Sequence, residues 1–234
     1  MSKPSSGVLK FLKKLRGDKN KVTGGEKQMA ILRQIPKVLK FIPGKAQDLR
    51  AYFLSMQYWL AGSEENIESL FCYLLSRYSS LHNSSKVEIK SPVEYPETGL
   101  YHPDIPKKIT ENISEIPFVK HSIGTVGLLL MRSYVLSGDT AHYDQVIRSL
   151  EAKGLKVIPA FAAGLDARPA INKYFVQNAK ASIDTFLSLT GFSLVGGPAY
   201  NSSKAAEEAL AELDVPYIAC LLYTSDAADE WRSG

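Results

Sequence analysis

Apolar residues recur at helical spacing through residues 28–78, which are predicted to form a helical segment. In residues 46–61 the apolar positions follow an i, i+4, i+7, i+11 pattern: Leu49, Phe53, Met56 and Leu60. In residues 64–78 they form a second stripe: Ile67, Leu70, Phe71, Leu74, Leu75 and Tyr78. Ser63 is placed to cap the second helix. Two amphipathic helices with a short turn between them predict an antiparallel helical pair.

From residue 123 onward the pattern alternates between short apolar runs and helical segments. The apolar runs that predict strands are IGTVGLLLMRS, LKVIPAFAAG, SIDTFLSLTGF and VPYIA. The helical segments between them are GDTAHYDQVIRSLEAKG, RPAINKYFVQ and NSSKAAEEALAELD. Such alternation with short links is typical of a parallel sheet with right-handed crossovers. The predicted fold class is α/β, with N-terminal amphipathic helices followed by a parallel, doubly wound βα segment over residues 123–219.

Two stretches lack this periodicity and are predicted to connect other parts of the chain. Residues 1–27 are rich in Lys, Gly and Ser, which is typical of a basic flexible connector. Residues 79–122 are punctuated by five prolines and are predicted to be a Pro-rich connection: Pro92, Pro96, Pro103, Pro106 and Pro117.

The charge of the chain is concentrated at one end. Residues 1–50 hold 13 Lys and Arg against 3 Asp and Glu, whereas the remaining 184 residues hold 15 against 21. A basic arm can bind nucleic acid, but this arm lacks the aromatic interleaving that base stacking needs, so no nucleic-acid partner is expected. No apolar run reaches the length of a transmembrane helix, and no secretory signal is recognisable. A cytoplasmic location is therefore expected, where Cys72 and Cys220 make no disulfide framework.

Candidate binding residues lie where the predicted strands end, because ligands of doubly wound sheets bind beyond the carboxyl ends of the strands. The candidates for substrate binding are Arg132, His142, Asp166, Thr190, Gly196 and Gly197. Turn and cap geometry explains these residue types equally well. The sequence contains no G-x-G-x-x-G, P-loop, G-x-S-x-G, C-x-x-C or H-E-x-x-H motif, and no histidine pair with metal-ligand spacing. No catalytic residue and no metal site is assigned.

Whole blocks of the chain carry a family resemblance. They are VLKFIPGKAQDLRAYFLSMQYWLAGSEENI, PVEYPETGLYHP, GTVGLLLMRSYVLSGDTAHYDQVIRSLEAKGLKVIPAFAAGLDARPAINKYF and SLTGFSLVGGPAYN. From about residue 28 to residue 219 the chain resembles the large, porphyrin-binding H subunit of magnesium chelatase. The blocks LLLMRSYVLSGDTAHYD and GFSLVGGPAYN are more similar to the bacteriochlorophyll-making version than to the plant and cyanobacterial one. The large subunit of cobaltochelatase is a more distant relative.

The resemblance implies a role in a ligase complex that inserts Mg²⁺ into protoporphyrin IX in a phototrophic bacterium. In that family the H subunit binds the porphyrin, and the partner I and D subunits of the AAA+ type hydrolyse ATP. The absence of a P-loop from this sequence agrees with that division of labour. The H subunit is several times longer than this chain, so the chain is expected to be a fragment that is inactive alone. No catalytic residue is carried over.

The last residues, 220–234, depart from the family. The string CLLYTSDAADE resembles a translated transposase-type sequencing adapter, so residues 220–234 are interpreted as a non-native tail; a divergent natural C-terminus is the alternative. Two other functions stay open. One is a stand-alone α/β binding module whose basic arm recognises an anionic partner, and the other is a cobaltochelatase of corrin synthesis.

Overall fold

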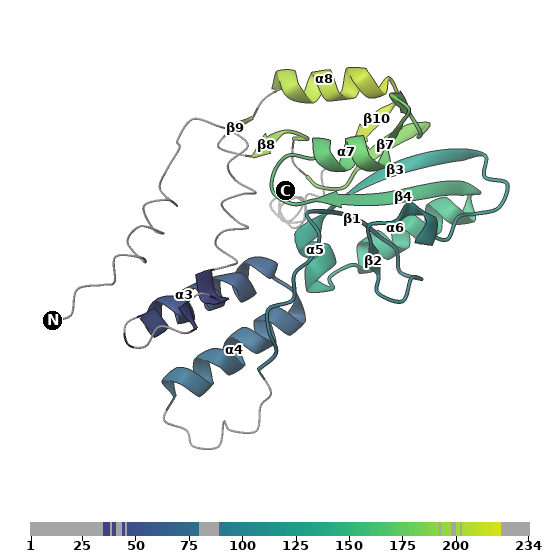
Figure 1. Ribbon diagram of the computed structural model, residues 1–234. Coiled ribbons are helices and arrows are strands. Elements are labelled where there is room, and N and C mark those ends of the chain that lie inside the picture. The colour runs from purple at the N-terminus through teal and green to yellow at the C-terminus, as the bar shows by residue number, and fades with distance from the viewer. Residues whose placement is uncertain are drawn as a thin grey trace, which may run out of the picture. The chain divides into compact units, whose positions relative to one another are not determined.

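The chain forms two compact units, one ending at Glu94 and the other beginning at Tyr95 (Figure 1). The computed structural model describes residues 35–37, 39–40, 44, 46–79, 89–191, 193–197, 200–201 and 203–220. The predicted connector and nearly all of the predicted non-native tail lie outside these residues. None of the helices in the described ranges is long and apolar enough to cross a membrane.

The first unit contains the predicted pair of helices, α3 (Ala46–Ala61) and α4 (Glu64–Tyr78). The chain turns between them at Gly62, whose φ of +65° favours glycine. Ser63 then caps α4, because its Oγ accepts the backbone N–H of Asn66 at 3.3 Å. Arg77 in the last turn of α4 lies 2.8 Å from Asp48 in the first turn of α3, as the predicted antiparallel arrangement requires.

The face that α4 buries is not its apolar stripe. The residues that α4 buries are Asn66, Ser69 and Leu70. Of the predicted stripe only Leu70 is buried, so the remaining five residues, Ile67, Phe71, Leu74, Leu75 and Tyr78, are called the α4 stripe below. The inward position of the polar face follows from Asn66, whose Oδ1 accepts the N–H of Val93 at 2.9 Å while its Nδ2 donates to the Val93 carbonyl at 3.0 Å.

The second unit is built on a six-stranded sheet of order β10-β7-β3-β4-β1-β2. Its parallel strands are those that the apolar runs predict: β3 (Gly124–Met131), β4 (Leu155–Ala162), β7 (Thr185–Ser188) and β10 (Tyr217–Ala219). The five central residues of each of the long strands β3 and β4 form a continuous run without polar side chains, because they are buried on both faces of the sheet. The parallel α/β prediction is confirmed.

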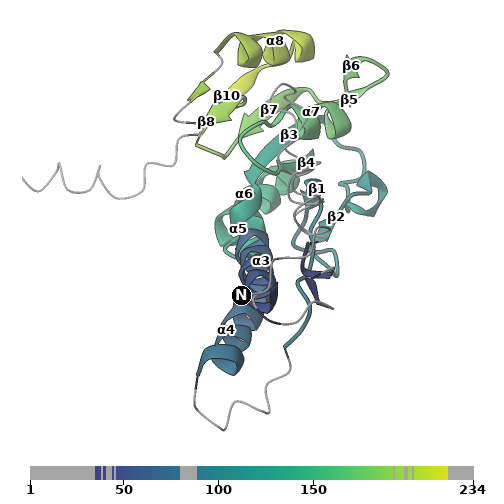
Figure 2. The same ribbon diagram turned by 60° about the vertical axis from the view of Figure 1, so that its left-hand side comes forward.

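Helices cover both faces of this sheet, which is the predicted doubly wound arrangement (Figures 1 and 2). On one face Leu128 and Leu130 of β3 pack in a cluster with Tyr143 and Ile147 of α6 (Ala141–Ala152). On the other face Leu129 belongs to a cluster with residues of α7 (Arg168–Tyr174) and α8 (Ser203–Leu213). Alternate residues of one strand therefore build two separate cores.

Some short elements were not predicted. The Pro-rich stretch supplies β1 (Thr98–Tyr101), which pairs antiparallel with β4, and β2 (Ile109–Thr110), which pairs antiparallel with β1 at the edge of the sheet. Its prolines flank these strands and do not interrupt them, which is where strands tolerate proline. The other additions are α5 (Arg132–Ser137), the 3₁₀ turn Ile113–Glu115, and the hairpins β5 (Val176–Gln177) with β6 (Lys180–Ala181) and β8 (Gly196–Gly197) with β9 (Tyr200–Asn201).

Candidate functional site

The order of the strands places a topological switch between β3 and β7. The chain passes from β3 to β4 on one side and then returns to β7 on the other side of β3. The two strand ends lie together, since the N–H of Leu189 donates to the carbonyl of Leu129 at 2.9 Å. Ligands of doubly wound sheets bind at such a switch, so the residues that follow β3 and β7 form the candidate site.

Arg132 opens α5 immediately after β3 and is tied to the start of β1. Its Nε donates to the carbonyl of Pro96 at 3.0 Å, and its Nη2 donates to the carbonyl of Tyr95 at 3.2 Å. Because β1 runs antiparallel to β4, the segment that enters β1 lies at the same edge as the end of β4. Arg132 therefore holds two parts of the candidate edge together.

The loops that follow β4 and β7 are joined to each other at this edge. The N–H of Ala167 donates to the carbonyl of Leu194 at 2.9 Å, and the N–H of Gly196 donates to the carbonyl of Leu165 at 2.7 Å. Gly196 has a φ of +91°, a conformation that only glycine adopts without strain. Gly197 follows it in β8. Gly196 therefore takes part in the contact that joins the two loops, and Gly197 directly follows it.

Asp166 lies between these loop contacts and forms a local ion pair. Its carboxylate accepts the backbone N–H of Arg168 at 3.0 Å, and its Oδ2 lies 2.6 Å from Nη2 of the same arginine. Hydrogen bonds from the Arg168 guanidinium lower the pKa of the Asp166 carboxyl below its ordinary value. Asp166 is therefore a carboxylate at neutral pH and holds the first turn of α7.

The last two predicted residues have different neighbours. The Oγ1 of Thr190 lies 3.1 Å from the Oγ of Ser188, at the end of β7. His142, in the first turn of α6, packs its ring against Tyr143 and Tyr134, with ring centroids 3.9 and 5.4 Å away. The structure therefore brings Asp166 and Gly196 into one pair of joined loops, whereas Thr190 contacts Ser188 and His142 contacts Tyr134 and Tyr143, which are near neighbours in the sequence.

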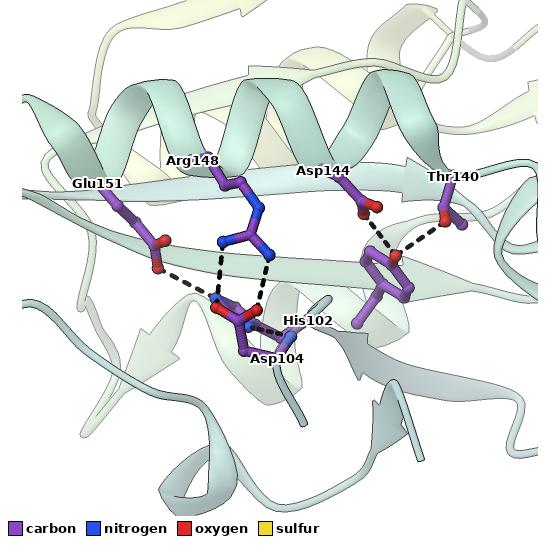
Figure 3. Close-up of polar contacts among 7 residues, drawn as sticks. His102, Asp104, Thr140, Asp144, Arg148 and Glu151 are labelled. Atoms are coloured by element: carbon purple, nitrogen blue, oxygen red, sulfur yellow. Dashed lines mark hydrogen bonds and ion pairs between the residues drawn. The ribbon is translucent and has the colours of Figure 1, made fainter. Parts of the chain in front are cut away.

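A second group of polar residues, which sequence reasoning missed, joins the turn between β1 and β2 to α6 (Figure 3). The hydroxyl of Tyr101 lies 2.5 Å from Oδ1 of Asp144 and 2.9 Å from Oγ1 of Thr140. Since a phenol has one proton, Tyr101 donates it to the Asp144 carboxylate and accepts from the Thr140 hydroxyl. Burial, together with the hydrogen bond to Asp144, raises the pKa of Tyr101 to about 12.

His102 is fully buried in the same group, and both of its ring nitrogens have partners. The N–H of Asp104 donates to Nδ1 at 3.1 Å, so Nδ1 carries no proton. The proton of the neutral ring is then on Nε2, which donates to Oε1 of Glu151 at 3.0 Å. The carboxylate of Asp104 in turn accepts two hydrogen bonds from Arg148, at 2.6 and 3.3 Å.

The contacts among seven residues are called the α6 clamp below: Tyr101, His102, Asp104, Thr140, Asp144, Arg148 and Glu151. Its members on α6, Asp144, Arg148 and Glu151, are spaced i, i+4, i+7 and so line one face of the helix. That spacing is visible in the sequence, but its partners lie at the end of β1 and in the turn that follows it, which the apolar pattern does not predict. The clamp satisfies its own hydrogen-bonding groups, and the described residues contain no group of three or more His, Cys, Asp or Glu that could hold a metal. The arrangement therefore positions α6 against the end of β1 and the turn that follows it.

Comparison with known proteins gives family matches over nearly the whole chain. The family described as CobN/Magnesium Chelatase matches residues 56–234, and one described as a domain of unknown function (DUF3479) matches residues 1–53. The first of these matches includes the predicted non-native tail, whose interpretation stays a prediction.

Comparison with individual proteins gives the sequence identity and the share of each chain that is matched. The chain is 56% identical over 232 residues to the magnesium-chelatase H subunit of Cereibacter sphaeroides, which covers 99% of this chain and 19% of that protein. It is 54% identical over 234 residues to the magnesium-chelatase H subunit of Rhodobacter capsulatus, covering 100% of this chain and 19% of that protein. It is 35% identical over 245 residues to the chloroplastic magnesium-chelatase ChlH subunit of Oryza sativa, covering 99% and 18%. The chain thus spans about a fifth of the length of these curated relatives.

One solved structure supports the fold. The catalytic subunit of cobaltochelatase from Mycobacterium tuberculosis matches 79% of this chain and 14% of its own, with a TM-score of 0.51 and 21% sequence identity. At that identity the likeness concerns the fold alone.

Proposed function

Because the chain belongs to the CobN/magnesium chelatase family, we propose that it forms part of the porphyrin-binding H subunit of a magnesium chelatase. The observation that carries this proposal is the 54–56% identity, over the whole chain, to two proteins of that name. In this function a ligase complex inserts Mg²⁺ into protoporphyrin IX, and partner I and D subunits of the AAA+ type hydrolyse ATP. Both of these bacterial relatives are more similar than the rice one, which favours the bacteriochlorophyll version in the cytoplasm of a phototrophic bacterium.

The carboxyl edge of the sheet is the proposed contribution of this chain to substrate binding. A porphyrin is a flat apolar ring with carboxylate side chains, and it must be held while Mg²⁺ sheds its tightly bound water. The edge offers a guanidinium at Arg132, polar side chains at His142, Asp166 and Thr190, and small residues at Gly196 and Gly197. The α6 clamp supports this role, because it fixes the helix whose first turn carries His142.

The test uses a full-length chimeric subunit, in which residues 1–219 replace the homologous fifth of the Cereibacter sphaeroides protein. We expect the chimeric subunit, with I and D subunits and ATP, to convert protoporphyrin IX to its Mg²⁺ complex, and the chain alone to be inactive. A chimeric subunit that folds and binds its partners but makes no Mg²⁺ porphyrin would refute the proposal. Insertion of Co²⁺ into a corrin precursor instead would assign the cobaltochelatase function.

The role of the edge is tested by one substitution with a matched control. Arg132→Ala in the chimeric subunit should weaken porphyrin binding by about tenfold, the usual effect of one lost charge-assisted contact. Lys173→Ala is the control, because Lys173 is a cation of the same domain that pairs with Glu111 at 2.8 Å on the exposed surface. Equal affinities for the two variants, measured by porphyrin fluorescence, would remove Arg132 from the site.

The uneven charge of the sequence supports a second candidate, a stand-alone module that binds an anionic partner. Residues 1–50 carry the excess of Lys and Arg, and binding through such an arm weakens steeply with salt. Salt-sensitive binding of the isolated chain to anionic vesicles or nucleic acid, combined with an inactive chimeric subunit, would favour this candidate.

A further inference from the structure

The α4 stripe exposes more apolar surface than an isolated helical pair can explain. Phe71, Leu75 and Tyr78 lie at i, i+4, i+7 on one side of α4 and are 59%, 53% and 64% exposed. The same helix buries Asn66 and Ser69 on its other side. A helix in water ordinarily does the reverse, burying its apolar face and exposing its polar one. The sequence of α4 is therefore adapted to a partner for the stripe.

The surroundings of the α4 stripe indicate the chemistry of that partner. Glu64 and Glu68 are exposed, and their spacing from Phe71 and Leu75 puts them on the same side of α4 as the stripe. Arg77 lies at the other end of the stripe: its Nε donates to the Tyr78 hydroxyl at 3.3 Å, its guanidinium lies 5.5 Å from the centre of the Tyr78 ring, and its Nη2 pairs with Asp48 at 2.8 Å. An apolar row with carboxylates at one end best fits an amphipathic helix whose apolar face is flanked by Lys or Arg.

The length of the relatives indicates where such a helix comes from. The Cereibacter and Rhodobacter relatives carry the equivalent of this chain within single polypeptides, and the match covers 19% of each. Four-fifths of each relative thus lies in the same molecule as the α4 stripe. A partner in the same polypeptide meets its site at an effective concentration of order millimolar, well above that of a separate protein.

We propose that the α4 stripe docks an amphipathic, basic-flanked helix supplied by the remainder of the full-length polypeptide, beyond the fifth that this chain spans. The contact is internal to the full-length subunit and buries Phe71, Leu75 and Tyr78. It differs from the proposed substrate edge, because it lies in the first unit and needs no porphyrin, metal or nucleotide.

The test compares side-chain oxidation by hydroxyl radicals in the isolated chain and in the chimeric subunit. Phe71, Leu75 and Tyr78 should be oxidised in the chain and protected by about fivefold in the chimeric subunit, as expected when exposed side chains enter an interface core. Tyr58, which is buried in the same helical pair, should react slowly in both and serves as the reference. Equal oxidation of the α4 stripe in chain and chimeric subunit would overturn the proposal.

A pair of neighbouring substitutions tests the same contact without labelling. Leu75→Glu should lower the unfolding midpoint of the chimeric subunit by several degrees, restore the oxidation of Phe71 and Tyr78, and leave the midpoint of the isolated chain unchanged. Ser76→Glu adds the same charge at the adjacent exposed position and should change neither midpoint.

The other possible occupants give distinct outcomes. Protection of the α4 stripe in the isolated chain at every protein concentration would mean that this chain covers its own stripe, and protection that rises with concentration would mean a second copy. Either result overturns the proposal. The inference rests on the proposed function, because the remainder of the polypeptide is that of an H subunit. None of these measurements uses the chelatase reaction, so a chimeric subunit that protects the α4 stripe but makes no Mg²⁺ porphyrin would uphold this inference and refute the proposed function.

Discussion

The two hydrogen bonds of His102 can be removed one at a time, so the contribution of each to the free energy of unfolding can be measured separately. An asparagine side chain places an oxygen close to the position of Nδ1, so His102→Asn keeps an acceptor for the Asp104 N–H but does not reach Glu151. A glutamine places an N–H close to the position of Nε2, so His102→Gln keeps the donor to Glu151 and loses the acceptor for Asp104. His102→Ala removes both.

The expected losses of stability differ because one bond involves a charge. The bond from Asp104 N–H to a neutral ring nitrogen contributes about 1 kcal/mol, so His102→Gln should lower the free energy of unfolding by roughly that amount. The bond from the ring to the Glu151 carboxylate contributes about 2 kcal/mol, and His102→Asn should cost that much. His102→Ala also leaves a void at a fully buried position, so its cost should reach about 4 kcal/mol.

Urea unfolding of the chain, followed by far-ultraviolet circular dichroism and by hydrogen exchange of the α6 amides, measures these costs. Tryptophan fluorescence is a poor probe here, because Trp59 belongs to the first unit and Trp231 lies outside the described residues. Arg148→Ala is the control on the same helix: its ion pair with Asp104 is about half exposed, so water screens it and its loss should cost little stability. If His102→Ala costs no more than Arg148→Ala, or if His102→Gln costs more than His102→Asn, the assignment of the two bonds is refuted.

Three shorter predictions concern other buried or strained positions. Gly127→Ala should destabilise the chain by about 1–3 kcal/mol, since the new Cβ would lie 2.7 Å from Cδ1 of Ile183, and adding Ile183→Val should recover part of that loss in thermal unfolding. Burial raises the pKa of both Tyr101 and Tyr143 to about 12, above the ordinary 10.0; their contribution to stability should be complete below pH 10 and lost as the pH rises towards 12, which an absorbance titration of phenolate alongside circular dichroism measures. Ala179→Gly should raise stability by about 0.5 kcal/mol in urea unfolding, because Ala179 has a φ of +58° in the turn between β5 and β6.

The strands that the sequence predicts are those with enough residues to carry a pattern. Strands β3 and β4 have eight residues each, and the five central residues of each form an uninterrupted buried run without polar side chains, because both faces are covered by helices. Strands β1 and β2 have four and two residues, too few for alternation to be recognised. Strand β1 forms through pairing with β4, a contact across about 60 residues of chain that local sequence does not encode, and β2 then pairs with β1.

Part of the candidate site was likewise predictable from the sequence, and part was not. The rule for doubly wound sheets predicts the edge at which Arg132 and Asp166 lie, because that rule needs only the order of the elements. The partners of Arg132 were not predictable, since they are backbone carbonyls of Tyr95 and Pro96 and any residue supplies a carbonyl. The partner of His102 was not predictable for a different reason. Glu151 is 49 residues away along the chain, and three charged residues at i, i+4, i+7 of a helix usually face solvent.

Helix α4 shows what hydrophobic periodicity does and does not establish. The stripe through Phe71, Leu75 and Tyr78 predicts a helix, and the helix is there, but the unit buries the opposite face. That face carries a polar residue, Asn66, because its side-chain amide hydrogen-bonds to both the N–H and the carbonyl of Val93. These backbone groups would otherwise need a neighbouring strand as their partner. A periodic stripe predicts a helix and a face suited to burial, without saying which surface covers that face or where in the chain it lies. Under the proposal above, the exposed α4 stripe is the surface that the remainder of the full-length polypeptide covers.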